Sequence, residues 1–188
     1  MMTKTQYYTA TTLDGYIAGP GDSLDWLFTV EGGADEFAPY FADVGAFAMG
    51  ASTYEWILRH DRPHEDPEKW TGPYGSVPCW VFTHRELPVI PGADIRFVRG
   101  DVRPVHAEMT EAAAGRNIWI VGGGELAGTF ADHGLLDELL LSVAPVFLTE
   151  GAPLLPRRLL SEDLRLTGVR QASQFAVLTY ELVRQATS

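Results

Sequence analysis

The sequence is poor in cysteine and has no long hydrophobic run. One cysteine, Cys79, occurs in 188 residues, which excludes an internal disulfide bond and a cysteine-rich zinc site. The N-terminus, residues 1–6, lacks a charged start followed by an apolar segment, and no stretch of about 20 apolar residues follows anywhere. These absences predict a cytoplasmic protein with neither a signal peptide nor a membrane span.

Positive charge is also scarce. Fourteen Lys and Arg residues face 25 Asp and Glu residues, which gives a formal net charge of −11. This balance argues against a nucleic-acid partner, because phosphate backbones require basic surfaces. A small anionic ligand needs only a local positive pocket and stays compatible with the sequence. The five histidines show no spacing typical of metal ligands, so no metal site is predicted.

The apolar segments are short and separated by turn residues. They predict strands at 7–12, 46–50, 77–83, 95–99, 117–121 and 138–146, and helices at 34–43, from 52 onwards, at 102–114 and at 125–132. Residues 59–75 read as a polar loop, and 164–169 with 175–183 as an antiparallel hairpin. The alternation predicts one α/β domain over residues 1–188, with a mostly parallel sheet. Ligands bind such sheets beyond the carboxyl ends of the strands.

Three consecutive glycines follow one of these strands. The run Gly122-Gly123-Gly124-Glu125-Leu126-Ala127 fits the pattern G-x-G-x-x-A and opens a helix, whose free N–H groups favour a phosphate. The run lies two-thirds of the way along the chain, and no acid ends the next strand, so an ordinary Rossmann domain is rejected. A tight turn without any ligand is the alternative interpretation.

Two further strand ends carry polar side chains. In "AFAMGASTYEW" (46–56), Ser52 and Glu55 have the spacing of a helix capping box. In "CWVFTHRE" (79–86), the strand ends in a hydroxyl, an imidazole and a guanidinium, which together suit a phosphate monoester. Taken alone, the first segment is better explained as an ordinary helix cap and the second as a solvated loop. Together, all three strand ends are placed to face one ligand.

These segments, together with "TTLDGYIAGPGDSLDWL" (11–27) and "NIWIVGGGELAGTF" (117–130), resemble the dihydrofolate reductase superfamily in order and spacing. The resemblance is closest to the C-terminal reductase domain of the bifunctional riboflavin-biosynthesis deaminase–reductase, and it covers about residues 5–183. The deaminase half is absent. The resemblance implies a mixed, mostly parallel sheet of about eight strands flanked by helices, with NADPH as the cofactor. A homodimer is also expected from it.

The resemblance implies a reductase of a small heterocyclic or ribosylamino-pyrimidine substrate, such as 5-amino-6-(5-phosphoribosylamino)uracil or dihydrofolate. The alternative is a non-catalytic nucleotide-binding or sensor protein that keeps the fold. No G-x-S-x-G or H-E-x-x-H pattern supports a hydrolase.

Site residues follow from the resemblance, residue by residue. The resemblance assigns the phosphate and ribose contacts to Gly50, Ser52 and Thr53. It assigns the contacts with the adenosine 2′-phosphate to Thr83, His84 and Arg85. Pyrophosphate and nicotinamide ribose contacts fall to Val121, Gly122, Gly123, Gly124, Glu125 and Leu126. The chain departs from many relatives at Ala51, where they carry an arginine that contacts phosphate.

The resemblance also implies a carboxylate near the substrate. Asp35 and Glu36 are the candidates for assisting protonation, although acids at a helix start also complement the helix dipole. Asp25 and Trp26 are expected to edge the substrate pocket, and Ser142 to support the carboxylate.

Overall fold

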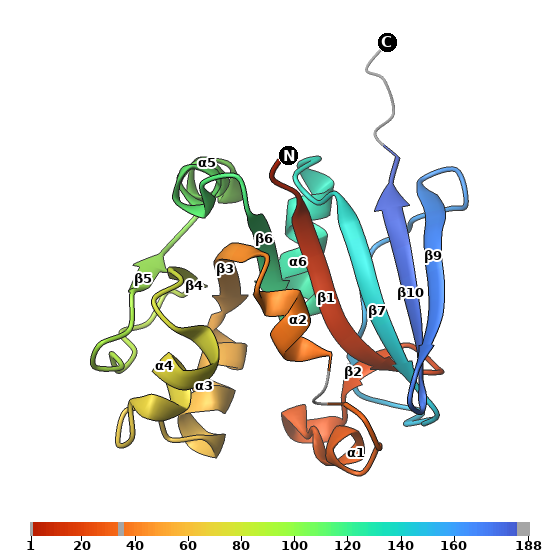
Figure 1. Ribbon diagram of the computed structural model, residues 1–188, viewed down its shortest axis with the longest axis horizontal. Coiled ribbons are helices and arrows are strands. Elements are labelled where there is room, and N and C mark those ends of the chain that lie inside the picture. The colour runs from red at the N-terminus through yellow and green to blue at the C-terminus, as the bar shows by residue number, and fades with distance from the viewer. Residues whose placement is uncertain (1, 34–35, 184–188) are drawn as a thin grey trace.

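The computed structural model describes residues 2–33 and 36–183, which form an eight-stranded sheet in the order β5-β4-β3-β6-β1-β7-β10-β9 (Figure 1). The first six strands in this order are parallel, and β10 is antiparallel to both β7 and β9. A second, two-stranded sheet pairs β2 with β8. The predicted fold is therefore confirmed. The strands are β1 (Thr5–Thr12), β2 (Tyr16–Ala18), β3 (Val44–Gly50), β4 (Cys79–Phe82), β5 (Ile95–Val98), β6 (Asn117–Val121), β7 (Glu138–Ala144), β8 (Ala152–Pro153), β9 (Leu164–Ala172) and β10 (Phe175–Leu182).

Helices cover both faces of the large sheet. One face packs against α5 and α6, which lies behind the sheet in Figure 1, and the other against α1, α2, α3 and α4. No helix in the described part of the chain is long and apolar enough to cross a membrane. The helices are the short 3₁₀ helix η1 (Pro20–Asp22), α1 (Asp25–Phe28), α2 (Phe37–Phe41), α3 (Ala51–His60), α4 (Glu68–Tyr74), α5 (Val102–Ala113) and α6 (Gly124–Asp132).

Strand β3 shows why the centre of the sheet is apolar on both sides. Its residues from Val44 to Met49 are all buried. Ala46 and Ala48 contribute to the core formed with α5 and α6, whereas Phe47 and Met49 contribute to the core formed with α3 and α4. A parallel strand covered on both faces reads as a continuous apolar run, as this one does.

The start of α3 differs from the prediction. The helix begins at Ala51 with Gly50 as its N-cap, and no side chain accepts a capping hydrogen bond. The predicted capping box of Ser52 and Glu55 is therefore wrong. Because β3 runs directly into the helix, Ser52 already stands in the first helical turn, and Glu55 forms an ion pair with Arg85 instead.

Two other segments also differ. The predicted loop 59–75 contains α4, which forms because Trp70 buries its ring against Phe47 and Tyr54. The helix predicted at 34–43 is shorter, since α2 starts at Phe37, and Glu36 occupies its N-cap position rather than its first turn.

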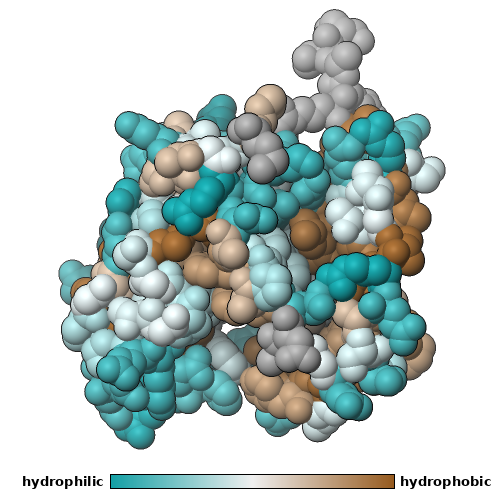
Figure 2. All heavy atoms as spheres, in the orientation of Figure 1, coloured by the Kyte–Doolittle hydropathy of each residue, from teal (hydrophilic) through white to brown (hydrophobic). Residues whose placement is uncertain are grey.

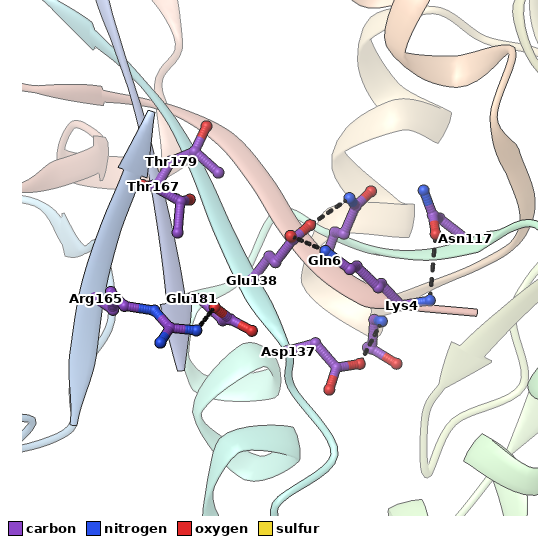
Figure 3. Close-up of polar contacts among 10 residues, drawn as sticks. Lys4, Gln6, Asn117, Asp137, Glu138, Arg165, Thr167, Thr179 and Glu181 are labelled. Carbon is purple, nitrogen blue, oxygen red and sulfur yellow. Dashed lines mark hydrogen bonds and ion pairs between the residues drawn. The ribbon is translucent and has the colours of Figure 1, made fainter. Parts of the chain in front are cut away.

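A polar network lies at the amino ends of the strands (Figure 3), where its residues line a hollow of about 560 Å³. Glu138 of β7 pairs with Lys4 and accepts a hydrogen bond from Gln6 Nε2 at 2.8 Å. Next to it, Arg165 of β9 pairs with Glu181 of β10. The pairs link β1 to β7 and β9 to β10, so this end of the sheet is held together, and the open end lies opposite.

At the open end, Asp14 joins the turn after β1 to the segment after β7. Its carboxylate accepts hydrogen bonds from the Thr12 hydroxyl at 2.6 Å and from the backbone N–H of Thr149 at 2.7 Å. The Thr12 hydroxyl, followed by the backbone donors, lowers the pKa of Asp14 below its usual value of 3.8.

We expect Asp14→Asn to lower the Tm at neutral pH, because the ionised acceptor of several donors is lost. A pKa that is lowered in the folded state gives stability above the pKa of the unfolded chain, and this stability disappears as pH falls through the folded value. The Tm difference from the wild type should therefore be constant above about pH 5 and shrink below about pH 4. Calorimetric melts across this range measure it; a difference independent of pH would contradict the assignment.

Candidate active site

Two adjoining cavities lie at the carboxyl ends of the parallel strands. The first, here called the glycine cavity, has a volume of about 210 Å³ and lies between Gly122 and Gly123, the start of α3, and the segment 17–27. The second, the aromatic cavity, measures about 240 Å³ and is lined by residues of β1, β6, β7 and β10. Both are lined by Thr9, Ala10, Leu27 and Gly122, so they form one cleft. Figure 2 shows this side of the molecule hollowed between the lobe of α3 and α4 and the lobe of α1.

Two of the three glycines in the turn after β6 are required by packing. Gly122 has a φ of +73°, and a Cβ on it would lie 2.4 Å from Thr53 Oγ1. A Cβ on Gly124 would lie 2.3 Å from the carbonyl oxygen of Leu154. The Tyr7 hydroxyl stands 3.0 Å from the Gly122 carbonyl and 2.8 Å from that of Leu154. These contacts fix the turn against α3 and the segment around β8.

Gly123 has a different role. Its φ is −55°, no atom lies within 4 Å of the position of an added Cβ, and it lines the glycine cavity. It is also the N-cap of α6, where backbone N–H groups and the helix dipole favour an anion. The hydroxyl residues Ser52 and Thr53 line the same cavity. A cradle that a side chain would fill, surrounded by these donors, fits the pyrophosphate of a dinucleotide.

The other residues predicted around the turn serve mainly structural contacts. Glu125 is 75% exposed and pairs with Arg157, whereas Leu126 packs against the core beneath α6. Val121 lines the aromatic cavity, and Gly50 caps α3 without lining either cavity. From Gly124 to Leu126, the groups that the start of α6 leaves available to a ligand are the backbone N–H groups.

Aromatic rings form much of the second cavity. Trp119 donates its indole N–H to the Tyr8 carbonyl at 3.0 Å, and the Phe37 ring lies 5.5 Å from the Trp119 ring. Tyr8 stacks on Tyr40 at 4.0 Å, and burial raises the pKa of the Tyr8 hydroxyl. With Phe175 on the opposite side, the cavity has the shape and chemistry for a flat ring.

The aromatic cavity also contains an acid and a hydroxyl. Glu36 lines it, with 29% of its side chain exposed, and is paired with Arg170 of β9. Ser142 of β7 is buried and lines the same cavity. Asp35, the other predicted acid, lies outside the described residues. The structure therefore brings Glu36 and Ser142 together at one cavity.

Asp25 and Trp26 are not brought into this cleft. Trp26 is buried in a cluster with Ala144, Phe175 and Val177, so its ring supports the cavity wall from behind. Asp25 lines an adjoining hollow together with Arg59 and His60, and this hollow shares Asp22, Leu24 and Trp56 with the glycine cavity. On the one-turn helix α1, the Trp26 indole therefore faces the core, whereas the Asp25 carboxylate stays outside.

The strand end at Thr83 forms a second corner, apart from the cleft. Thr83 Oγ1 accepts a hydrogen bond from the Arg85 backbone N–H at 3.0 Å, so its hydroxyl shapes the turn. Arg85 forms two contacts of 2.9 Å with Glu55, and His84 is exposed. A hollow of about 370 Å³ here is lined by Thr83, Arg85 and also Arg99, which sequence reasoning missed.

Sequence reasoning also missed most of the apolar lining. Phe175 could have been predicted from the sequence, because the last strand of the antiparallel hairpin starts at the end of the sheet where the parallel strands finish. Trp56 also had a signal, one turn after Ser52 and Thr53 on the same helix. The wall formed by β2 and β8 had no local signal, because its strands are only three and two residues long.

We expect Gly123→Val to weaken NADPH binding by about 10-fold or more while leaving the Tm nearly unchanged, because its side chain enters ligand space and meets no protein atom. Gly124→Ala is the contrasting variant, since its Cβ meets a backbone carbonyl and should lower stability by about 1–3 kcal/mol. Titration calorimetry and thermal melts separate the two effects. Unchanged affinity in folded Gly123→Val would remove the turn from the site.

Comparisons with known proteins agree with this architecture. Residues 3–178 match the RibD C-terminal domain family. YwjB, an uncharacterized protein of Bacillus subtilis (strain 168), is 33% identical over 181 residues, which cover 96% of this chain and 98% of YwjB. A solved structure from Shewanella sp. PV-4, whose name proposes a role in riboflavin biosynthesis, has a TM-score of 0.76 at 25% identity and covers 97% of this chain and 100% of its own.

Dihydrofolate reductase from Enterococcus faecalis, solved with NADP(H), shares the fold with a TM-score of 0.65 at 14% identity, over 95% of this chain and 96% of that enzyme. The family match spans nearly the whole chain and includes every strand that borders the cleft. The chain therefore belongs to the RibD C-terminal domain family.

Proposed function

We propose that the protein is an NADPH-dependent reductase of a small, planar nitrogen heterocycle. The family and the shared fold support a reductase-type function. The observation that carries the proposal is the continuity of the cleft: a phosphate-sized cradle at Gly123 joins a cavity walled by aromatic rings. A dinucleotide held at the first cavity would bring its reactive end beside a ring held in the second.

NADPH supplies a hydride when bound. The protein contributes alignment, since most of the effect of such a site comes from holding two reactants in contact. The N-terminus of α6 and the hydroxyls of Ser52 and Thr53 hold phosphate and ribose. The rings of Trp119 and Phe175 orient the acceptor and exclude water from it.

Glu36 is the group for proton chemistry. Glu36 is paired with Arg170, and its carboxylate oxygens can accept hydrogen bonds from ring N–H groups. A substrate N–H that reaches Glu36 competes with Arg170, and Ser142 lies at the same cavity to orient the ring. A water held by the carboxylate would give a proton to the ring nitrogen and regain one from bulk solvent.

The charges of the cleft favour one of the two predicted substrate types. Among the described residues that line the two cavities, the charged side chains are Asp22 and Glu36, and none is Lys or Arg. Because Glu36 already pairs with Arg170, a phosphorylated ribosyl group in these cavities would find no unpaired cation in their lining. A neutral or protonated ring without phosphate suits the lining, so a pterin-like substrate is favoured over a phosphoribosylamino pyrimidine.

NADPH oxidation, followed with dihydrofolate, with a phosphoribosylamino pyrimidine and with its dephosphorylated form, tests this function. We expect turnover of the unphosphorylated rings, and at least 10-fold higher kcat/KM for the dephosphorylated pyrimidine than for its phosphate. Tight NADPH binding in calorimetry without turnover of any ring would instead favour a non-catalytic nucleotide sensor.

We expect Glu36→Gln to lower kcat by about 10²–10⁴-fold with little change in NADPH affinity, because proton-transfer groups contribute on this scale. Asp35→Asn is the companion variant, since both acids are candidates. Glu31→Gln is a matched control, because Glu31 is an exposed acid that lines neither cavity. Activity of Glu36→Gln equal to that of the control would exclude Glu36 from the chemistry.

A further inference from the structure

Arg85 is the residue that the resemblance assigns to the adenosine 2′-phosphate, but its guanidinium is already occupied. Both terminal nitrogens contact Glu55 of α3 at 2.9 Å, and Glu55 is only 24% exposed. A phosphate approaching Arg85 must displace this carboxylate or accept its repulsion. Arg85 is therefore poorly placed to distinguish NADPH from NADH.

Arg99 stands beside it without such a partner. Phe82 and Val98 are paired in the β4–β5 register, and the Thr83 N–H donates to the Val98 carbonyl at 3.0 Å. Arg99 is therefore the first residue after β5, and Thr83 is the first residue after β4, so both lie at the carboxyl ends of the strands. Within residues 2–33 and 36–183, its guanidinium forms no hydrogen bond or ion pair, and it lines the 370 Å³ hollow.

The same hollow offers an apolar surface. Val89 and Phe97 line it and are 64% and 37% exposed, and the Tyr54 ring supports Phe97 edge-on at 5.6 Å. An aromatic face beside a free guanidinium suits a nucleoside phosphate, whose base can lie on the ring while its phosphate accepts from the guanidinium. Glu86 is the acid of this lining, opposed by two arginines.

We propose that Arg99, rather than Arg85, recognises the 2′-phosphate of NADPH in this hollow, and that Glu55 restrains the preference for NADPH by occupying Arg85. The inference rests on the proposed function for the identity of the ligand. Arg99 supplies a two-pronged, permanently charged donor, and its charge is not already neutralised.

Titration calorimetry of NADPH and NADH with the wild type and four variants, Arg99→Ala, Arg85→Ala, Glu55→Gln and Arg96→Ala, tests it. Arg99→Ala should weaken NADPH by about 10-fold or more and leave NADH unchanged, the expected loss for a charged hydrogen bond. Glu55→Gln should strengthen NADPH binding by freeing Arg85, a gain that misfolding cannot produce. Arg96→Ala removes equal charge from β5, the strand that precedes Arg99, but Arg96 pairs with Asp94 over the Trp80 ring, so it should change neither affinity.

Each other outcome has a defined meaning. If Arg85→Ala abolishes the preference for NADPH while Arg99→Ala does not, the assignment to Arg99 is overturned. Equal wild-type affinities for NADPH and NADH overturn it while the proposed reductase stands. A wild type that binds neither dinucleotide overturns the cofactor of the proposed function, and this inference falls with it.

Discussion

The close packing of the turn after β6 is the constraint on which the cleft depends. Thr53 packs against Gly122, and the Leu154 carbonyl packs against Gly124. A Cβ on either glycine would overlap its neighbour. The buried Tyr7 hydroxyl lies within hydrogen-bond distance of the Gly122 and Leu154 carbonyls and so links these two segments. Interiors packed this densely cannot deform continuously, so the turn holds α6 and α3 at a fixed separation. Of the three glycines, Gly123 alone has an open Cβ position, and this open space at the start of α6 is a consequence of how its neighbours pack.

Strand direction explains why the remaining parts of the cleft meet there. The six parallel strands place Gly50, Val121 and the segment after Ala144 at the same end of the sheet, where the strands finish. The antiparallel β10 then starts at this edge, which adds Phe175 to the wall. At the opposite end of the sheet, Lys4 and Glu138 form an ion pair, so their charges compensate each other. The sheet therefore has a neutralised end and an open end whose helix starts offer unpaired N–H groups.

The sequence predicted what depends on local pattern and missed what depends on distant contacts. Periodicity located the main strands, and the resemblance named Gly123, Glu36 and Ser142, which the structure places on the cleft. The capping box failed because the helix start is set by β3 running into it. The pairs of Glu55 with Arg85 and of Glu36 with Arg170 join residues 30 and 134 positions apart. No local signal records such pairs, although they decide which charged groups remain available to a ligand.

Charge pairing is the last step in understanding how an acidic chain binds an anion. With a net charge of −11, a free guanidinium is readily neutralised by a nearby carboxylate. Arg157 contacts both Glu125 and Asp132, and Arg85 and Arg170 are also paired. Long-range attraction for a phosphate is therefore weak, since paired charges cancel beyond a Debye length of about 8 Å. Anion binding then depends on fixed backbone N–H groups at α6 and on the few cations left unpaired. Such a surface would select by shape and short contacts, so the proposed dinucleotide, which would reach both corners, would be favoured over phosphate in general.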